Sequence, residues 1–159
     1  CSSGEELYTL AICLDEVRHQ FAGWDISLLG SDISETMISA ARKGVFPNRS
    51  LDQTSEERRA RYFEQLPDEA GWSIRPRLIS MCEFQRHNLL TPMPGEKFDC
   101  IFIRNVFIYF DRESKQIAVQ NLIRSLAPGG ALVVGPADGI YDLLGELNKK
   151  TTFLYEKPH

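Results

Sequence analysis

The hydrophobic residues of this chain follow two spacings, which predict two kinds of element. Between Glu5 and Gln20, apolar residues recur three and four positions apart, as expected for a helix that lies on a core. Short, mostly apolar runs such as 98–103 are instead typical of strands buried on both faces. The pattern predicts helices at 5–20, 34–43, 55–66 and 112–126, and strands at 26–29, 98–103, 131–134 and 151–155.

Local signals refine these boundaries. Gly30 is expected to end the strand 26–29, and Gly44 to end the helix 34–43. Trp72–Arg75 and Leu78–Arg86 are predicted to be two short strands around Pro76, forming an inserted hairpin. The predicted apolar stripes are Leu7, Leu10, Ala11, Leu14 and Val17 in the first helix, Tyr62, Phe63 and Leu66 in the third, and Val119, Leu122, Ile123 and Leu126 in the last.

Buried runs that alternate with amphipathic helices imply an α/β fold with a parallel sheet covered on both faces. Ligands of such sheets bind beyond the carboxyl ends of the strands, so the residues that follow each apolar run are the candidates for a site. These candidates are the turn 1–6, Asp32, the segment 88–90, and Arg104–Val106 with Tyr109.

Composition and charge exclude several classes of protein. The 159 residues carry 18 Lys plus Arg against 22 Asp plus Glu, a net charge of −4, which argues against a nucleic-acid binder. No apolar run approaches the roughly 20 residues of a membrane-spanning helix. The 4 cysteines are far apart and form no C-x-x-C, so no metal site is expected. Reduced thiols without a signal peptide predict a cytoplasmic protein, and Cys1 is expected to be a cut end.

Each candidate also has a purely structural interpretation. Ser3 with Glu6 three residues later matches a capping box, and Asp32 could cap the helix that follows it. Asn88 is of a type common in turns, and Tyr109 could be a core residue with its aromatic neighbours. An arginine at the end of a strand, such as Arg104, commonly pairs with a nearby acid. The order of all four groups along the chain nevertheless suits a nucleotide-type pocket.

Several motifs of the chain resemble those in the catalytic domain of the CheR family. The members of this family are S-adenosylmethionine-dependent protein-glutamate O-methyltransferases that act on chemotaxis receptors. The resemblance covers nearly the whole chain, and the stretch from Arg104 to Asp111 is its most specific part. The motifs are Cys-Ser-Ser-Gly-Glu-Glu at 1–6, Gly-Ser-Asp-Ile-Ser at 30–34, Ala-Arg-Lys-Gly at 41–44, Arg-Tyr-Phe at 61–63, Asn-Leu-Leu at 88–90, Phe-Asp-Cys-Ile-Phe-Ile-Arg-Asn-Val-Phe-Ile-Tyr-Phe-Asp at 98–111, and Leu-Ala-Pro-Gly-Gly at 126–130.

The resemblance implies a cofactor, S-adenosylmethionine, and a position for each part of it. Glu6, with Glu5 beside it, is expected near the amino-acid end of the cofactor. Asp32 is expected to bind the ribose hydroxyls, and Asn88 and Leu89 to hold the adenine.

The same resemblance implies that Arg104 and Asn105 contact the cofactor and that Tyr109 lies close to the reacting centre. Arg104 and Tyr109 are therefore the expected catalytic residues. The product formed from the cofactor would be S-adenosylhomocysteine, and the methyl group would go to glutamate carboxylates of a chemoreceptor-like protein.

The resemblance also implies a Rossmann-like class I methyltransferase sheet with a small inserted β-subdomain, for which 46–87 is the candidate. The whole chain, 1–159, is expected to be one catalytic domain and a monomer that is not inserted in a membrane. The family's N-terminal helical domain, with an arginine that it contributes to the site, and its first strand are absent from this chain.

Two other functions are compatible with the residues. One is a CheR-like module that binds the cofactor as a sensor or docking partner without methyl transfer. It is favoured by the missing N-terminal part and by Gly-Pro-Ala-Asp at 135–138, where the family usually has Gly-His-Ser-Glu. The other is a nicotinamide-dependent dehydrogenase, which Asp32 and the Gly4 turn would allow, but the chain lacks a G-x-G-x-x-G motif.

Overall fold

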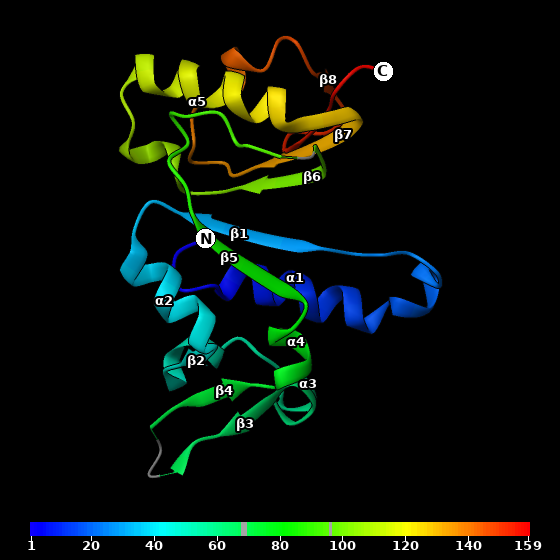
Figure 1. Cartoon of the computed structure of the whole chain (residues 1–159), viewed down its shortest axis with the longest axis vertical. Helices are drawn as coiled ribbons and strands as arrows, with labels where there is room; N and C mark the ends of the chain where they lie inside the picture. The colour runs from blue at the N-terminus through cyan, green and yellow to red at the C-terminus, as the bar shows by residue number, and fades with distance from the viewer. Residues whose placement is uncertain (68–69, 96) are drawn as a thin grey trace. The chain divides into compact units, whose positions relative to one another are not determined.

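The computed structural model describes residues 1–67, 70–95 and 97–159. The chain divides into two compact units, Cys1–His87 and Asn88–His159, each with its own hydrophobic core (Figure 1). The expectation that 1–159 acts as one catalytic domain stays a prediction.

The first unit is built around two parallel strands. β1 (Leu28–Asp32) and β5 (Cys82–Arg86) pair residue by residue along their whole length. Helices α1 (Glu5–Glu16) and α2 (Glu35–Lys43) pack against these strands, and both lie below them in Figure 1. Because the strands are parallel, their carboxyl ends share one edge of the sheet, where ligands of α/β folds bind.

Both ends of α2 follow the local sequence signals. The Ser34 hydroxyl caps the first turn by accepting a hydrogen bond from the backbone N–H of Met37 at 3.4 Å. Gly44 ends the helix in the left-handed conformation, with φ of 59°. A Cβ atom at Gly44 would lie 2.7 Å from Ile74 Cγ2, so packing also requires glycine there. The helix predicted at 34–43 is therefore confirmed.

α1 differs from its prediction at its start. Its N-cap is Gly4, with φ of 94°, and the Ser3 hydroxyl donates to the Glu5 carboxylate at 2.8 Å. The predicted capping box between Ser3 and Glu6 is wrong, because the left-handed turn at Gly4 directs the chain into the helix instead.

The end and the buried face of α1 also differ from the prediction. The helix stops at Glu16 and is followed by a short 3₁₀ helix, η1 (Arg18–Phe21), so the predicted range 5–20 is too long. Tyr8 packs its ring against Phe46 and Phe84, which rotates the buried face away from the predicted stripe. The buried residues of α1 are Leu7, Tyr8, Ala11, Ile12 and Asp15.

The strand predicted at 26–29 lies two residues further along the chain. β1 runs through Gly30 instead of ending there, and Asp32 is its last residue. A Cβ atom at Gly30 would lie 2.9 Å from the ring of Phe84 on β5. The glycine therefore serves the close approach of an aromatic ring and not a turn.

A small antiparallel sheet occupies the part of the first unit between α2 and β5. Its strands lie in the order β2 (Val45–Phe46), β4 (Trp72–Ile74) and β3 (Phe63–Gln65). A 3₁₀ helix, η2 (Asn48–Leu51), and helix α3 (Glu56–Tyr62) lie between β2 and β3. That 46–87 is an inserted subdomain stays a prediction.

Two predictions for this region are wrong. The segments 72–75 and 78–86 do not form a hairpin, because Pro76 begins helix α4 (Pro76–Ile79) between them. As a result β4 joins the small sheet while β5 pairs with β1. The helix predicted at 55–66 ends at Tyr62, where the chain extends into β3, although Tyr62 and Phe63 are buried as predicted and Leu66 is half-buried.

A buried carboxylate ties α1 to α3 and α4. Asp15, whose side chain is 6% exposed, accepts two hydrogen bonds from Arg77, at 2.6 and 3.1 Å, and one from the Tyr62 hydroxyl at 3.1 Å. Arg61 lies 3.5 Å from the same carboxylate. The guanidinium groups of Arg61 and Arg77 lie 5.1 and 5.4 Å from the centre of the Tyr62 ring, within range of a cation–π contact.

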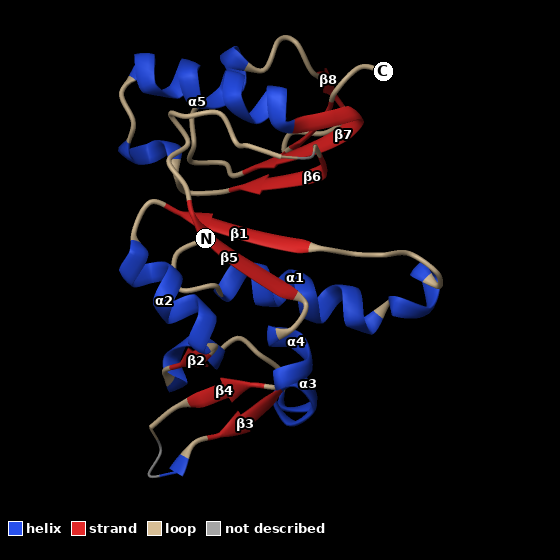
Figure 2. Ribbon diagram, viewed as in Figure 1, coloured by secondary structure: helices blue, strands red, loops and turns tan. Residues whose placement is uncertain are grey.

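The second unit contains a mixed sheet and one long helix. Helix α5 (Arg112–Ser125) connects the parallel strands β6 (Phe98–Ile103) and β7 (Leu126–Val134) and runs alongside β7 in Figure 2. β9 (Leu154–Glu156) pairs antiparallel with β7, and β8 (Asn148–Lys149) with β9.

The local predictions for this unit are confirmed more closely than its topology. The strand 98–103 has the predicted bounds, but it is not buried on both faces, since Ile103 is its one buried residue. The helix at 112–126 ends one residue early, and its predicted stripe is buried. The expectation of an all-parallel sheet is wrong, because the last strand begins at Leu154 and runs antiparallel. The Thr151 hydroxyl accepts hydrogen bonds from the N–H groups of Phe153 and Leu154, which turns the chain before that strand.

All four cysteines are free thiols, and burial raises the pKa of Cys82 to about 11, which makes it a poor nucleophile.

Among the described residues, no helix has the length and apolar character needed to cross a membrane.

Candidate functional site

Asp32 stands at the carboxyl end of β1, and two loops direct backbone N–H groups at it. The N–H of Ser2 donates to Asp32 Oδ2 at 2.9 Å, and the N–H of Ser34 donates to Oδ1 at 3.0 Å. Burial alone would raise the pKa of this carboxyl, but these hydrogen bonds lower the pKa below its usual value. Asp32 is therefore a fixed negative charge at the sheet edge.

The turn that precedes α1 passes directly over this carboxylate. Ser2 has φ of 49° and Gly4 has φ of 94°, so two left-handed residues shape the turn. Glu5 is exposed and Glu6 is half-buried, both in the first turn of α1. The structure thus brings the predicted turn 1–6 and Asp32 together through the Ser2 amide.

Asn88 and Leu89 form the start of the second unit. The Asn88 side-chain oxygen accepts a hydrogen bond from the N–H of Leu90 at 3.0 Å, and its carbonyl accepts one from the N–H of Thr91 at 2.9 Å. The Leu89 carbonyl accepts a hydrogen bond from the Asn121 amide group on α5 at 2.9 Å. Asn88 is thus a turn residue, and that turn is fixed to α5.

The Arg104–Tyr109 segment follows β6 and turns into a 3₁₀ helix, η4 (Phe107–Tyr109). Phe107 is fully buried, whereas the Tyr109 side chain is 83% exposed. The interpretation of Tyr109 as a core residue is therefore wrong, and its ring is available to a ligand. Arg104 and Asn105 are exposed as well, and Asn105 adopts the left-handed conformation with φ of 57°.

Asp138, to which the sequence patterns assign no role, fixes this segment. Asp138 is fully buried and accepts hydrogen bonds from the N–H groups of Asn105, Val106 and Phe107 at 3.1, 2.9 and 3.0 Å. Two signals were available: Asp138 ends the stretch 135–138, where the CheR resemblance leads one to expect Gly-His-Ser-Glu, and it is an acid directly before Gly139, shortly after an apolar run. That pattern is also typical of an ordinary surface turn.

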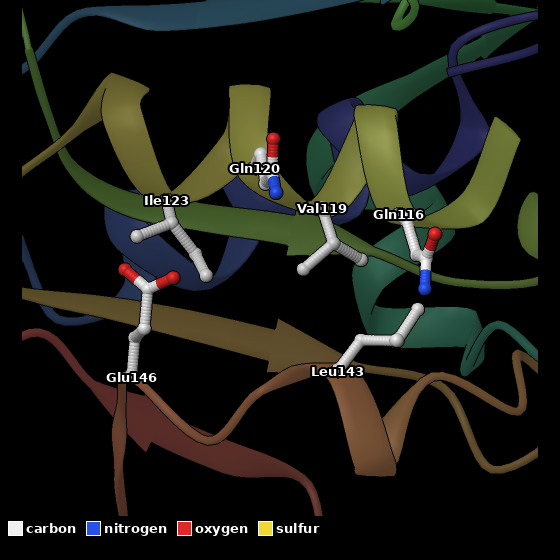
Figure 3. A pocket seen from close by; sticks show the side chains of 6 residues that line it. All are labelled: Gln116, Val119, Gln120, Ile123, Leu143 and Glu146. Carbon is white, nitrogen blue, oxygen red and sulfur yellow. The ribbon is translucent and has the colours of Figure 1, made fainter. Parts of the chain in front are cut away.

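Two clefts lie elsewhere. A cleft of about 260 Å³ lies between α5 and the segment 143–146, and Figure 3 shows Leu143 and Glu146 facing Gln116, Val119 and Ile123 across it. Another, of about 510 Å³, lies beside Trp24 at the amino end of β1. None of the predicted site residues lines either cleft.

The predicted site residues divide between the two units. Glu5, Glu6 and Asp32 belong to the first, and the segments 88–89 and 104–109 belong to the second. That these residues meet at one pocket stays a prediction.

The family model described as "CheR methyltransferase, SAM binding domain" matches residues 1–153 of the chain. The chain belongs to the CheR methyltransferase family. The resemblance found in the motifs is thereby confirmed, and S-adenosylmethionine (SAM) is the cofactor of this domain.

Curated relatives of this CheR domain come from several bacteria. Chemotaxis protein methyltransferase 1 of Pseudomonas aeruginosa is 33% identical over 148 residues, which cover 90% of this chain and 54% of the relative. The chemotaxis protein methyltransferase of Listeria monocytogenes is 36% identical over 143 residues, which cover 88% of this chain and 52% of the relative. The chain therefore spans about half the length of the curated relatives it matches.

A solved structure supports the fold of the CheR domain. The N-methyltransferase NodS of Bradyrhizobium japonicum WM9 matches with a TM-score of 0.50 at 16% identity, over 84% of this chain and 74% of that chain. The predicted Rossmann-like, class I methyltransferase fold is confirmed by this likeness and by the family match.

The Asp32 carboxylate of this CheR domain can accept a hydrogen bond from a cofactor hydroxyl group. A carboxylate offers about four lone-pair positions, and the N–H groups of Ser2 and Ser34 and the Cys1 nitrogen, 3.3 Å from Oδ2, use only part of them. The Asp32 side chain is 21% exposed, so a ligand can reach the part of the carboxylate that remains. An ionised acceptor held by backbone amides is already oriented before the cofactor binds.

Proposed function

We propose that the protein containing this chain transfers a methyl group from SAM to glutamate side-chain carboxylates of a chemoreceptor-like protein. The products would be glutamate methyl esters and S-adenosylhomocysteine. The observation that carries the proposal is the family match over residues 1–153, and the names of the chemotaxis relatives support it.

The chemistry needs no general base. A glutamate carboxyl has a reference pKa of about 4.3 and is already ionised at neutral pH, so its oxygen can attack directly. SAM supplies an activated methyl group on a sulfonium. The protein has to hold the attacking oxygen in line with that methyl group and to exclude water, which otherwise solvates the carboxylate.

The residues of the first unit would bind two parts of the cofactor. Asp32 would accept hydrogen bonds from the ribose hydroxyls, and Glu6, with Glu5 beside it, would lie near the amino group of SAM. The arrangement that supports these roles is the turn at Ser2, which passes over Asp32 and leads into the first turn of α1.

The residues of the second unit would complete the site. Asn88 and Leu89 would hold the adenine, Arg104 and Asn105 would contact the cofactor, and Tyr109 would lie close to the sulfonium. The exposure of Tyr109 and the left-handed turn at Asn105 support these roles, because both present groups to the end of β6.

The chain would act as one catalytic domain, a cytoplasmic monomer, with 46–87 as an inserted subdomain. The three-stranded antiparallel sheet β2-β4-β3, which lies apart from the parallel pair β1-β5, supports the assignment of the insertion.

The decisive experiment incubates the protein, as its gene encodes it, with SAM carrying a labelled methyl group and with chemoreceptor cytoplasmic fragments. Label in a base-labile ester on glutamate is the expected result. The matched control is a fragment whose glutamates are replaced by alanine, which should stay unlabelled. SAM binding by calorimetry without any label transfer would contradict the proposal and favour the non-catalytic module.

The role of Tyr109 is tested by two substitutions. If the ring supports the cationic end of SAM, Tyr109→Phe keeps kcat unchanged, while Tyr109→Ala lowers kcat by roughly 2- to 30-fold, the range of a cation–π contact. An equal loss in both variants would assign the role to the hydroxyl. The exposed Tyr141 on the same unit is the matched control, since Tyr141→Phe loses only a hydrogen bond to the Gly135 carbonyl.

A further inference from the structure

We propose that Asp138 is a positioning residue, which holds Arg104, Asn105 and Tyr109 in the conformation that binds SAM. This inference rests on the cofactor-binding roles proposed above for that segment. Asp138 itself is fully buried, so we expect it to act through the segment and not by contact with the cofactor.

The Asp138 carboxylate collects four backbone N–H groups. Oδ1 accepts from Val106 at 2.9 Å and from Phe107 at 3.0 Å. Oδ2 accepts from Asn105 and from Gly135, both at 3.1 Å. Three of these four donors are consecutive residues of the segment that follows β6, and the fourth follows the end of β7.

This arrangement accounts for the unusual backbone of the segment. Successive N–H groups that point to one side, with a left-handed residue among them, form a concavity that binds an anion. Here Asn105 is the left-handed residue, with φ of 57°, and the anion is the chain's own Asp138. Without the carboxylate, nothing would offset the repulsion among the aligned N–H groups and the cost of the left-handed turn.

Asp138 is itself held from two sides. Its backbone carbonyl accepts a hydrogen bond from Lys115 Nζ on α5 at 3.0 Å. A Cβ atom at Gly135 would lie 2.7 Å from Asp138 Oδ2 and 3.2 Å from the Cα of Arg104, so only glycine leaves room for the carboxylate. The segment is therefore fixed to α5 and to the end of β7 through one side chain.

Two substitutions disturb this contact, and only the first leaves the packing around Arg104 unchanged. In Asp138→Asn, the side-chain NH₂ has to face either the pair Val106 and Phe107 or the pair Asn105 and Gly135, and in both orientations donors oppose donors. Gly135→Ala instead pushes a methyl group against Oδ2, and this methyl group also lies 3.2 Å from the Cα of Arg104. For each variant we expect SAM affinity, measured by calorimetry, to fall roughly tenfold, as for loss of hydrogen bonds to a charged group.

The matched control is Asp111→Ala. Asp111 is exposed, lies at the other end of the same segment, and caps α5 by accepting from the N–H of Ser114 at 2.8 Å. Its loss should lower the melting temperature but leave SAM affinity unchanged. If Asp138→Asn lowers the melting temperature in the same way and also leaves SAM affinity unchanged, Asp138 has only a structural role and the proposal is overturned.

A double-mutant cycle tests whether Asp138 acts through the segment. If it does, the double variant Asp138→Asn/Arg104→Ala should have nearly the same SAM affinity as one of the single variants, namely the one that binds SAM more weakly. If the fold-loss of SAM affinity in the double variant equals the product of the two single fold-losses, the proposal is overturned. If Arg104→Ala alone has no effect on SAM affinity, the assigned contact is wrong and the positioning role fails with it.

The outcomes separate this proposal from the proposed function. SAM affinity requires no methyl transfer, so a protein that transfers no label still gives a result for Asp138. Conversely, unchanged affinity in Asp138→Asn, together with labelled glutamate in the wild type, overturns the positioning role alone. If Asp138→Asn does not fold, Gly135→Ala carries the same predictions.

Discussion

Asp32→Ala is expected to weaken SAM binding by about 10- to 150-fold, the range for losing hydrogen bonds to a charged group. The carboxylate stands at the end of β1 and is held by the amides of Ser2 and Ser34, and its exposed part is the proposed acceptor for the ribose hydroxyls. Isothermal calorimetry with SAM measures the effect directly.

A cofactor analogue isolates the ribose contact from any movement of the two loops. The wild type should bind S-adenosylhomocysteine more tightly than its 2′-deoxy form, and Asp32→Ala should bind both equally. Equal affinity of the wild type for the two ligands would contradict the assigned role. Glu35→Gln is the matched control, because Glu35 is exposed at the start of α2 and pairs only loosely with Arg42, at 3.7 Å.

Asp15→Ala should lower the free energy of unfolding of the first unit by about 2–4 kcal/mol, because the buried Tyr62 hydroxyl loses its acceptor and Arg77 loses both of its hydrogen bonds. The arginines remain partly exposed and can be hydrated, which keeps the loss below that of an isolated buried charge. Urea unfolding followed by the fluorescence of Trp24 and Trp72, which both lie in this unit, measures the change.

The neighbouring residue gives a matched control for that effect. Glu16 also accepts two hydrogen bonds from one arginine, Arg58, at 2.8 and 2.7 Å, but at the surface. Glu16→Ala should therefore cost at most about 1 kcal/mol. Similar losses in the two variants would show that burial of the Asp15 carboxylate contributes little.

The Asp15 contribution should also depend on pH. Burial alone would raise the pKa of Asp15, but the hydrogen bonds from Arg77 and Tyr62 and the charges of Arg77 and Arg61 lower the pKa below its ordinary value. A lowered folded-state pKa means that the stabilisation is complete above the unfolded pKa, about 3.9, and is lost as pH falls through the folded value. The stability difference between the wild type and Asp15→Asn should therefore narrow below about pH 4. A difference that stays constant in urea titrations down to pH 3 would contradict this.

Elements with strong local signals could be predicted from the sequence. The helix α2 has Ser34 at one end and Gly44 at the other, and α5 has an apolar stripe that is buried as expected. The strand β6 is mostly apolar. In these cases the energetics of the cap, the turn or the burial pattern depend on residues that are close together in the chain.

Pairing partners could not be predicted in the same way. The segment 82–86 has the same apolar pattern whether it pairs with Trp72–Ile74 or with β1. The short helix that begins at Pro76 prevents a hairpin with Trp72–Ile74, and the segment pairs with β1 instead. Gly30 signalled a turn, but it lies within a strand because the ring of Phe84 packs against its backbone. Register and direction depend on contacts between distant residues, which local periodicity does not report.

The sequence by itself determined the family, the cofactor and the local identity of most helices and strands, because motifs and apolar spacing are properties of short segments. Only the tertiary structure decided that Asp32 ends a strand beneath the Ser2 amide, that Tyr109 is exposed while Phe107 is buried, and that Asp138 gathers three consecutive amides of the Arg104–Tyr109 segment. Asp138 lies more than thirty residues from those amides along the chain, with separations of 33, 32 and 31 positions. A buried carboxylate acquires its role from the donors that folding brings around it, and no short stretch of sequence contains them.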